Sequence, residues 1–436
     1  MRKFTVPAHP SEPARTGFAK IGRRIVPIAL GLYIISYLDR VNIGFAAPSM
    51  IKDLGFGPEV FGLAAGLFFV TYAVLEIPST MAAQRFGTRV WLARIMITWG
   101  VLAALTGLVQ NEAQLFVVRL LLGAAEAGAF PILLLWVSSW IPRESRARAF
   151  ALFIASLPLA AAIGAPLSGL LLSIEGPLGV EGWRLLFIVE AIPAVVAGIW
   201  VLFRLPESPS RVKWLTGLEQ EAVMGVLAEQ RQEVAGHRLA AATISDAFRS
   251  GRVWALGIAF MCISLGFYSL TLWQPMLVAN NFSSLTLWQL GWVNSIPFVL
   301  AVMAMYAVGR YCDRRGESRW IVLTLAAATA VGILVIADMG RVGYAGLIVA
   351  TMAIWSIAGV AWITPSRFLQ GRAAAGGVPL INSISALGGF IGPYTLGVLV
   401  AKGNPVAGLV FVAAAVLLGG TGYFVIASRF EKRRHR

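Results

Sequence analysis

Four ionisable residues lie inside long apolar stretches, where a membrane-spanning helix would bury them. Asp39 and Arg40 are in the first such stretch, and Arg119 and Glu126 are in the fourth. A charged side chain at the centre of a bilayer costs about 2.5–3.5 kcal/mol on insertion scales, so it is usually retained for a function. Arginine stays charged and its planar donors match a carboxylate, whereas aspartate and glutamate can gain and lose a proton. The four residues therefore predict a buried site that handles anions, protons or both.

Helical spacing allows these groups to lie near one another. Tyr37 and Arg40 are three residues apart and Arg119 and Glu126 are seven apart, so each pair shares one face of its helix. Asp39 is rotated by about 100° from Arg40. At about 1.5 Å per residue, Asp39 lies roughly 21 Å into its span, and Glu126 lies roughly 18 Å from the outer end of its own. We therefore expect the four groups to border one cavity at similar depth.

Each of the four groups has an expected role. Arg40 is the primary contact for a substrate carboxylate, because a guanidinium can donate two parallel hydrogen bonds. Arg119 is either a second substrate contact or the counter-charge of Glu126. Asp39 and Glu126 are the expected proton-coupling residues, since their protonation would depend on whether substrate occupies the arginine. The alternative is that ion pairs, Asp39 with Arg119 or Arg40 with Glu126, merely fix helix packing, although buried pairs are often no net gain in stability.

The composition is that of a membrane protein. Hydrophobic residues make up 58% of the chain and charged residues 13%, with a mean hydropathy of +0.76, whereas soluble domains have about 45–50% and about 25%. Apolar runs of about 20 residues, the length that spans a bilayer as a helix, recur throughout. The sequence predicts an all-α polytopic membrane protein with twelve transmembrane helices, at approximately 25–46, 61–82, 90–109, 114–140, 150–173, 183–204, 253–279, 288–309, 319–338, 344–364, 376–400 and 405–428.

Basic residues concentrate on alternate loops. With the N-terminus inside, they fall on both termini and on the loops around Arg85, Arg314 and Arg372, while the opposite loops carry few. This is the positive-inside pattern, which predicts that both termini are cytoplasmic and accounts for most of the net charge of +15 without nucleic acid. The first two dozen residues lack an apolar core and a cleavage site, so no secretory signal peptide is expected. Cys262 and Cys312 are too few for a disulfide framework.

One long polar stretch, 206–252, is expected to be a cytoplasmic linker with a surface helix. It separates an N-terminal cytoplasmic tail (1–24) and a six-helix bundle (25–205) from a second six-helix bundle (253–428) and a basic cytoplasmic tail (429–436). The bundles look like repeats, because the loop AQRFGTR is matched by GRYCDRRGESR at an offset of 229 residues and GAPLSG by GPYTLG at 227. Two pseudo-symmetric bundles predict a substrate site near the midplane between them. The glycines and prolines are equally suited to close packing and kinks.

The second of these loops, 309–316, follows the pattern Gly-x-x-x-Asp-Arg-x-Gly, whereas the first has lost the leading glycine and the aspartate. Together with six plus six helices, this loop resembles the major facilitator superfamily. The resemblance implies that these two loops take part in the conformational change, through Arg85 and Gly87 in the first loop and Asp313, Arg314 and Gly316 in the second.

Longer strings resemble one branch of that superfamily, the anion:cation symporter family. They are YLDRVNIGFAAPSM (37–50), EIPSTMAAQRFGTRVWLARIMITWG (76–100), GWRLLFIVEAIPAV (182–195) and INSISALGGFIGPYTLG (381–397). Members of the family carry tartrate, sugar acids, phthalate and other organic acids with protons. The resemblance implies that Asp39 and Glu126 couple protons, that Arg40 meets the substrate carboxylate and that Tyr72 lies on the substrate side.

The repeat offset places aromatic residues in the second bundle where the first has charges. Asp39 corresponds to Tyr268 and Glu126 to Trp355. We expect the second bundle to contact the remainder of the substrate, although tryptophans at helix ends are also typical of interfacial belts. The expected substrate-binding residues are Arg40, Arg119, Tyr37, Tyr72, Tyr268, Trp273, Trp355, Asn382 and Ser383.

These features predict a proton-coupled symporter that imports a small organic anion by alternating access across a bacterial-type cytoplasmic (inner) membrane. Ala386 stands where many members of the family have asparagine, and Leu157 stands near a position that is polar in sugar-acid carriers. The resulting cavity is less polar, which favours an aromatic carboxylate or a short dicarboxylate over a sugar acid. The proton is the coupling ion, no other cofactor or metal is expected, and a monomer is the default.

Two other classes of function are weighed against this one. A proton-driven efflux antiporter for drugs or metabolites would carry a Gly-x-x-x-Gly-Pro motif in helix 5, which 160–166 only approaches. A membrane-embedded enzyme is disfavoured, because all three histidines, His9, His237 and His435, lie in the tails or the linker and leave no intramembrane histidine for acid–base or metal chemistry.

Overall fold

The computed structural model describes residues 11–174, 179–238, 249–315, 318–338, 340–362 and 372–434. Within these ranges every extended regular element is a helix. The first group is α1 (Glu12–Leu54), α2 (Pro58–Phe86), α3 (Thr88–Thr106), α4 (Glu112–Glu126), α5 (Ala129–Ser138), α6 (Arg143–Leu172) and α7 (Gly182–Arg204). The second is α10 (Gly251–Asn281), α11 (Leu287–Arg315), α12 (Arg319–Val335), α13 (Arg341–Val360), α15 (Arg372–Ala386), α16 (Gly388–Ala401) and α17 (Pro405–Arg434).

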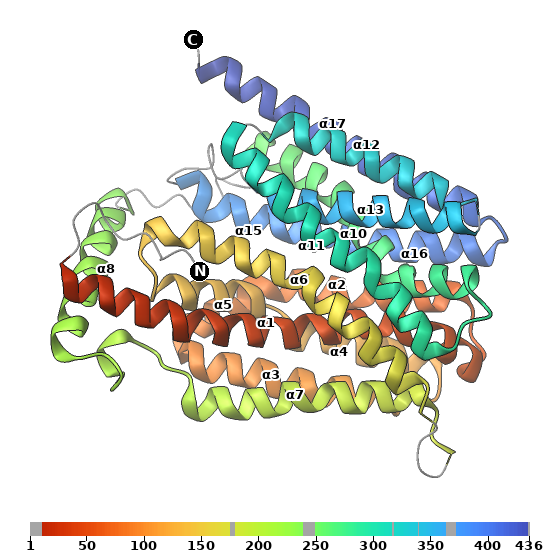
Figure 1. Ribbon diagram of the computed structural model, residues 1–436, viewed down its shortest axis with the longest axis horizontal. Coiled ribbons are helices and arrows are strands. Elements are labelled where there is room, and N and C mark those ends of the chain that lie inside the picture. Colours follow the sequence, from red (N-terminus) through yellow and green to blue (C-terminus); the bar gives the residue numbers. More distant parts are fainter. Residues whose placement is uncertain are drawn as a thin grey trace.

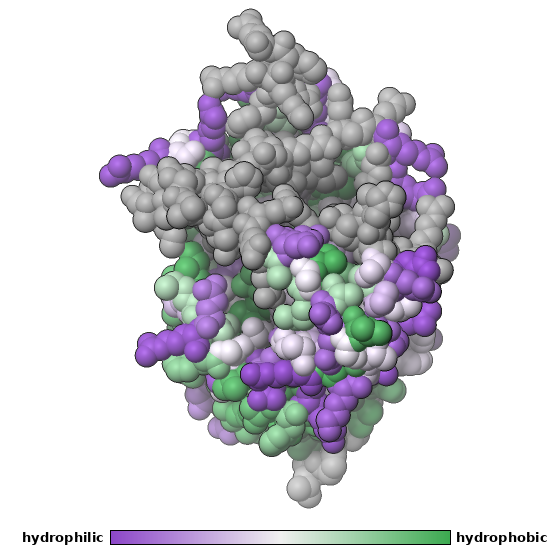
Figure 2. Space-filling view, turned by 90° about the vertical axis from the view of Figure 1, so that its left-hand side faces the viewer, coloured by the Kyte–Doolittle hydropathy of each residue, from purple (hydrophilic) through white to green (hydrophobic). Residues whose placement is uncertain are grey.

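These helices form two side-by-side bundles, α1–α7 in the lower part of Figure 1 and α10–α17 in the upper part. Eleven stretches of the described chain are long and apolar enough to cross a membrane, and α12 is a shorter apolar helix of 17 residues. In this count α4 with α5 makes one stretch, and α15 with α16 contributes another. The predicted fold class is therefore confirmed. The end that carries α8 (Gly217–Arg238) and the start of α1 shows hydrophilic side chains in Figure 2.

The fourth span is interrupted next to one of its charges. Helix α4 ends at Glu126, and α5 begins three residues later at Ala129. Gly128 between them has φ of 86°, and a Cβ there would lie 2.8 Å from Ser79 Oγ, so a larger residue would suffer both backbone strain and a clash. The continuous helix expected over 114–140 is therefore wrong at this point. Broken helices with binding groups at the break are a recurrent feature of transporters.

The two bundles meet tightly at the end farther from the chain termini. Helix α2 packs on α16 and α6 packs on α11, with glycine at the crossing points. A Cβ on Gly62 would lie 2.5 Å from Pro393 O, and one on Gly169 would lie 2.7 Å from Leu287 O. Backbones of opposite bundles are thus in direct contact, which small residues permit in membrane proteins. This contact closes one end of the space between the bundles.

Replacing Gly62 by leucine is expected to hold this end open, because the obstacle is a backbone carbonyl that has no rotamer to change. A cysteine placed at the buried Ser269 of α10 should then react faster with a water-soluble maleimide, in a background without the two native cysteines. Gly31→Leu is the control, since nothing lies within 4 Å of its added Cβ. Unchanged labelling would contradict this closing contact.

Helix α1 begins well before the membrane. It starts at Glu12, so half of the segment expected to be a tail (1–24) is helical, and α17 likewise continues to Arg434 beyond the expected boundary at 428. The early turns of α1 pack on linker helix α8. Lys20 Nζ lies 2.8 Å from Glu219 Oε2, and a Cβ on Gly17 would lie 2.7 Å from Val223. The linker, which also contains the short 3₁₀ helix Pro209–Arg211, is thus held against the first bundle.

The contact between α1 and α8 is expected to weaken in acid. Hydrogen bonds from Lys20 and from the backbone N–H of Thr216 lower the pKa of Glu219 to about 2. Since a free glutamate has a pKa of about 4.3, this contact stabilises the fold above that pH and is lost as the pH falls toward 2. Amide hydrogen exchange in α8, corrected for the intrinsic rate, should therefore accelerate in acid. Glu219→Gln should exchange faster at neutral pH and respond less to acid; equal behaviour of the two proteins would refute the prediction.

Candidate functional site

A cavity of about 170 Å³ lies between the bundles, on the side of the molecule toward the chain termini. It is lined from both bundles, by α1, α2, α5 and α6 on one side and by α10, α13 and α15 on the other. Of the residues predicted from the sequence, Arg40, Tyr72, Tyr268 and Asn382 line it. Hydrophobic side chains such as Phe69 and Leu157 make up much of the remaining wall. The cavity therefore presents one cation among hydroxyl, amide and apolar groups.

Arg40 and Glu126 form an ion pair at this cavity. The side chain of Arg40 is 11% exposed and that of Glu126 only 1%. Ser36 Oγ donates a hydrogen bond to Glu126 Oε1 over 3.2 Å, and the Arg40 guanidinium lies 5.1 Å from the ring centre of Tyr72. Arg40 Nε and Glu126 Oε2 are buried without a hydrogen-bond partner. The pair thus retains unused donor and acceptor capacity beside a cavity, unlike a pair built only for packing.

Asp39 faces away from the cavity. Its carboxylate accepts hydrogen bonds from Trp99 Nε1 over 2.6 Å and from Asn42 Nδ2 over 3.0 Å, and it is 2% exposed. The ion pair with Arg119 considered from the sequence does not form, since neither residue has an ion-pair partner among the described residues. The rotation of Asp39 from Arg40 on the helix accounts for this separation, because it directs the carboxylate to α3.

Arg119 is also outside the cavity lining. It is 2% exposed, its Nε donates to Ala64 O over 3.2 Å, and its guanidinium lies 5.1 Å from the ring centre of Phe68. The guanidinium of Arg40 lies 5.5 Å from the same ring, so Phe68 contacts both arginines. The expectation that all four charges border the cavity is therefore wrong: Arg40 lines it, Glu126 is reached through Arg40, and the other two lie behind.

Several aromatic residues expected to bind substrate instead join the two bundles. Tyr37 packs edge-on against Trp355 with ring centres 5.8 Å apart, and Phe61 packs against Trp273 at 5.4 Å. The two tryptophans are at most 2% exposed and do not line the cavity. Ser383 is likewise absent from the cavity lining, and its buried Oγ has no hydrogen-bond partner.

A second buried carboxylate, Glu76, touches the other bundle. Asn382 Nδ2 donates to Glu76 Oε1 over 2.7 Å and to Oε2 over 3.0 Å. These hydrogen bonds join α2 of the first bundle to α15 of the second. Glu76 is only 6% exposed, so its carboxylate is buried where the two bundles meet. The same signal that singled out Glu126, an acid in an apolar run, was present here.

Other polar groups at the cavity carried no sequence signal. Ser264 and Ser385 line it and their hydroxyls are 2.5 Å apart.

Glu190 accepts a hydrogen bond from Ser168 over 3.0 Å between α7 and α6, in keeping with a packing role.

The loop-motif residues that the structure describes, Arg85, Gly87 and Arg314, do not line this cavity. Arg85 lies in the last turn of α2, and Gly87 follows the helix with φ of 90°, a left-handed conformation that favours glycine. Arg314 is exposed in the last turn of α11. The side chain of Asp313 and all of Gly316 lie outside the described residues.

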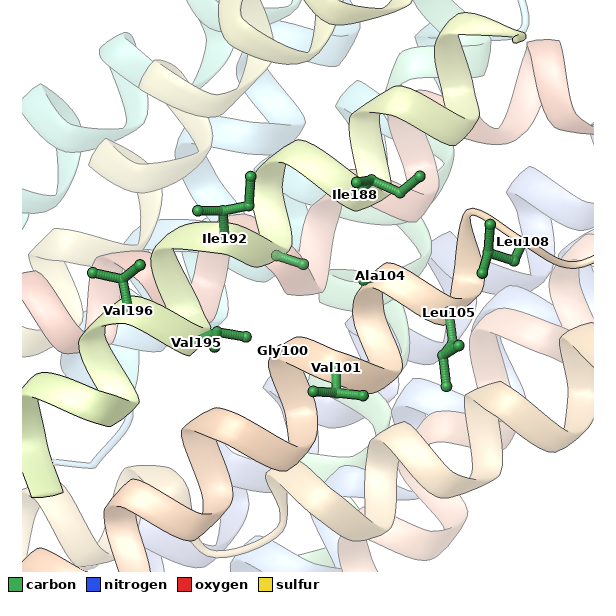
Figure 3. Close-up of a pocket in the computed structure, with 10 residues that line it drawn as sticks. Gly100, Val101, Ala104, Leu105, Leu108, Ile188, Ile192, Val195 and Val196 are labelled. Atoms are coloured by element: carbon green, nitrogen blue, oxygen red, sulfur yellow. The ribbon is translucent and has the colours of Figure 1, made fainter.

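A different, larger crevice of about 470 Å³ runs between α3 and α7 on the outside of the first bundle (Figure 3). Only apolar residues line it, among them Gly100, Val101, Leu105, Ile192 and Val196. It has no side chain that could orient a charged solute, so the cavity between the bundles remains the candidate site.

Comparison with known proteins agrees with this architecture. Residues 29–393 match the family model described as Major Facilitator Superfamily. A protein of Agrobacterium vitis named "Putative tartrate transporter" is 39% identical over 416 residues, covering 95% of this chain and 92% of that protein. The "Quinolone resistance transporter" of Acinetobacter baumannii is 32% identical over 414 residues, covering 94% and 95%.

Solved structures show the same fold. A bacterial homologue of the human lysosomal transporter Spinster, crystallised in an inward-facing and unoccupied conformation, matches with a TM-score of 0.71 at 18% identity, over 97% of this chain and 98% of that one. The inward-open xylose transporter XylE of E. coli matches with a TM-score of 0.71 at 15% identity, over 92% and 95%. The sequence resemblance is thereby confirmed, and the chain belongs to the major facilitator superfamily as a multi-pass membrane transporter of small molecules rather than an enzyme.

Proposed function

We propose that the protein is a proton-coupled symporter that imports a small organic anion by alternating access. Its location would be a bacterial inner membrane with both termini in the cytoplasm, so that the cavity of this structure faces the cytoplasm. The observation that carries the proposal is the Arg40–Glu126 pair beside the cavity between the bundles. The tartrate-transporter name of a 39% identical relative supports an organic anion as cargo.

Substrate and Glu126 would compete for one guanidinium. When a substrate carboxylate takes Arg40, Glu126 is left buried without its counter-charge, and breaking a buried pair costs about 3–5 kcal/mol. Protonation of Glu126 removes that cost. Anion binding and proton uptake at Glu126 therefore favour each other, which is the coupling free energy that symport needs.

The walls of the cavity favour a compact or aromatic acid. Ala386 and Leu157 line the cavity and present no polar group, while Phe69, Tyr72 and Tyr268 offer ring surfaces. The ring centres of Phe69 and Tyr268 are 4.2 Å apart across the bundle interface. An aromatic carboxylate or a short dicarboxylate would pack on these groups better than a sugar acid, because the apolar parts of the wall would leave some of its hydroxyl groups without partners.

A thermal-shift screen of the purified protein against organic acids tests the proposal. Tartrate, malonate, the phthalate isomers, hydroxybenzoate and sugar acids would be compared in weakly acidic and weakly alkaline buffer. A ligand at a hundred times its Kd stabilises by about 2.7 kcal/mol. We expect a shift in the unfolding temperature that depends on pH and disappears in Arg40→Ala. The absence of any shift with organic acids would contradict the proposal.

Efflux is the second candidate, favoured by the 32% identical relative named as a quinolone resistance transporter. The same screen separates the two functions when a fluoroquinolone and lipophilic cations are included. Shifts with these compounds alone would favour a proton-driven antiporter.

A further inference from the structure

A second polar hollow, of about 730 Å³, lies at the end of the first bundle near the chain termini. It forms where the membrane-entry part of α1, the start of α3, the last turn of α7 and the linker segment 205–214 meet. The charged residues around it are Arg24, Arg89, Arg204, Glu207, Arg211 and Lys213. The transport site described above uses none of them, so we refer to this hollow as the basic pocket.

The basic pocket has more positive charge than its own carboxylate can balance. Glu207 is shared by Arg89 at 3.5 Å and Arg211 at 3.4 Å, and Arg89 Nε remains buried without a hydrogen bond. Arg204 and Lys213 have no ion-pair partner among the described residues. Five cations against one anion leave an excess that a bound anion would offset.

Aromatic side chains connect the basic pocket to the hydrocarbon. Helix α7 ends at Arg204, so the basic pocket lies at the membrane surface. Trp200 and Phe203, in the last turn and a half of α7, also line it, and they are 40% and 71% exposed. Trp214 closes the opposite side and lies 4.9 Å under the guanidinium of Arg24. Aromatic residues next to arginine at this depth are typical of the headgroup region of a bilayer.

The apolar crevice of Figure 3 continues along the same two helices. At 1.5 Å per residue, Val196 lies about 12 Å along α7 from Arg204, and Gly100 lies about 16 Å along α3 from Arg89. One leaflet of the hydrocarbon core is about 15 Å thick. An acyl chain that starts at the basic pocket therefore reaches the near end of this crevice.

From this combination we propose that the basic pocket and the apolar crevice bind one anionic phospholipid. The headgroup phosphate lies among Arg89, Arg204 and Lys213, and an acyl chain follows the surface of Phe203 toward the groove between α3 and α7. Basic pockets between transmembrane helices on the cytoplasmic side are suited to anionic headgroups. A lipid in this position joins the end of α7 to the linker between the bundles, and it does so whichever solute the transporter carries.

Native mass spectrometry of the full-length protein with phosphatidylglycerol or phosphatidylcholine tests the proposal. The wild type is expected to retain phosphatidylglycerol in preference to phosphatidylcholine. The double variant Arg204→Gln, Lys213→Gln should bind phosphatidylglycerol about thirtyfold more weakly, since each basic residue near an anionic lipid contributes about 1 kcal/mol to binding. The matched control is Arg15→Gln with Arg23→Gln, two exposed residues of α1 with the same change of charge that should keep the lipid.

The second arm distinguishes a lipid from a soluble phosphate. Phe203→Ser should weaken the binding of the diacyl lipid, and glycerol 3-phosphate should compete poorly with the lipid for the basic pocket. If glycerol 3-phosphate binds as tightly and Phe203→Ser has no effect, the basic pocket is a soluble-phosphate site and the lipid proposal fails. Equal retention by the pocket pair and the control pair, or equal retention of the two phospholipids, overturns it as well. Thermal unfolding of each lipid-free variant verifies that it is folded.

Discussion

Arg40→Lys is expected to abolish substrate binding and transport. An ammonium retains the positive charge but loses the planar pair of donors, so it can hold either the substrate carboxylate or Glu126 by a single contact. Truncating one partner of a buried charge-assisted pair costs about 2–5 kcal/mol, which corresponds to a loss of affinity of about thirtyfold to several thousandfold. The measurement is the dissociation constant of the acid found in the thermal-shift screen, by isothermal calorimetry.

Two other arginines provide the comparison. Arg23→Lys, at an exposed position on the same helix, should bind normally. Arg119→Lys should have a smaller effect than Arg40→Lys, because Arg119 does not line the cavity and is held by Ala64 O behind Phe68. Normal affinity in Arg40→Lys, or the larger loss in Arg119→Lys, would transfer the anion-binding role away from Arg40.

Glu126→Gln is expected to separate exchange from accumulation. Glutamine has the same shape and can still accept the hydrogen bond from Ser36, but it carries no charge to compete for Arg40 and cannot release a proton. In proteoliposomes, counterflow exchange of labelled substrate should therefore survive, while accumulation driven by a pH gradient should be lost. The expected change is in the ratio of the two rates, which a partly unfolded protein would not alter.

The matched control is Glu190→Gln, a buried glutamate in the same bundle that is hydrogen-bonded to Ser168 and does not line the cavity. It should retain gradient-driven accumulation. Asp39→Asn serves as a third variant, because Asp39 is bound by Trp99 and Asn42 rather than by an arginine. If exchange and accumulation fall together in both Glu126→Gln and Asp39→Asn, neither carboxylate has the coupling role proposed for it.

Asp39 and Glu126 have different contacts, so we expect them to have different roles in proton coupling. Glu126 is paired with Arg40. In the proposed mechanism the substrate competes for this arginine, so protonation of Glu126 would depend on whether the cavity is occupied. Asp39 is joined to α3 through Trp99 and has no contact with the cavity. A proton on Asp39 would therefore act through the packing of α1 on α3, and its effect should appear in the rate of the conformational change rather than in affinity.

Helix number and the types of the charged residues were evident from the sequence alone. The cost of a polar group in hydrocarbon is a local, per-residue quantity, so an apolar run and an embedded charge can each be recognised without any knowledge of their neighbours. For this reason the all-helical fold, the two bundles and the candidate role of Arg40 followed from the order of residues. Even so, the helical part of 12–24 was missed, because its burial depends on contacts with α8 some two hundred residues away.

Only the tertiary structure decided which residue each buried charged side chain contacts. Spacing on a helix places Asp39 and Arg40 at the same depth, but it does not say which neighbour each one meets. The packing of α1 against α4 brings Arg40 into contact with Glu126. The position of α3 next to α1 lets Trp99 bind Asp39. The packing of α15 on α2 brings Asn382 into contact with Glu76. These contacts join residues 60 to 306 positions apart. Interactions of such long range arise from how the helices assemble, and no local pattern in the sequence encodes them.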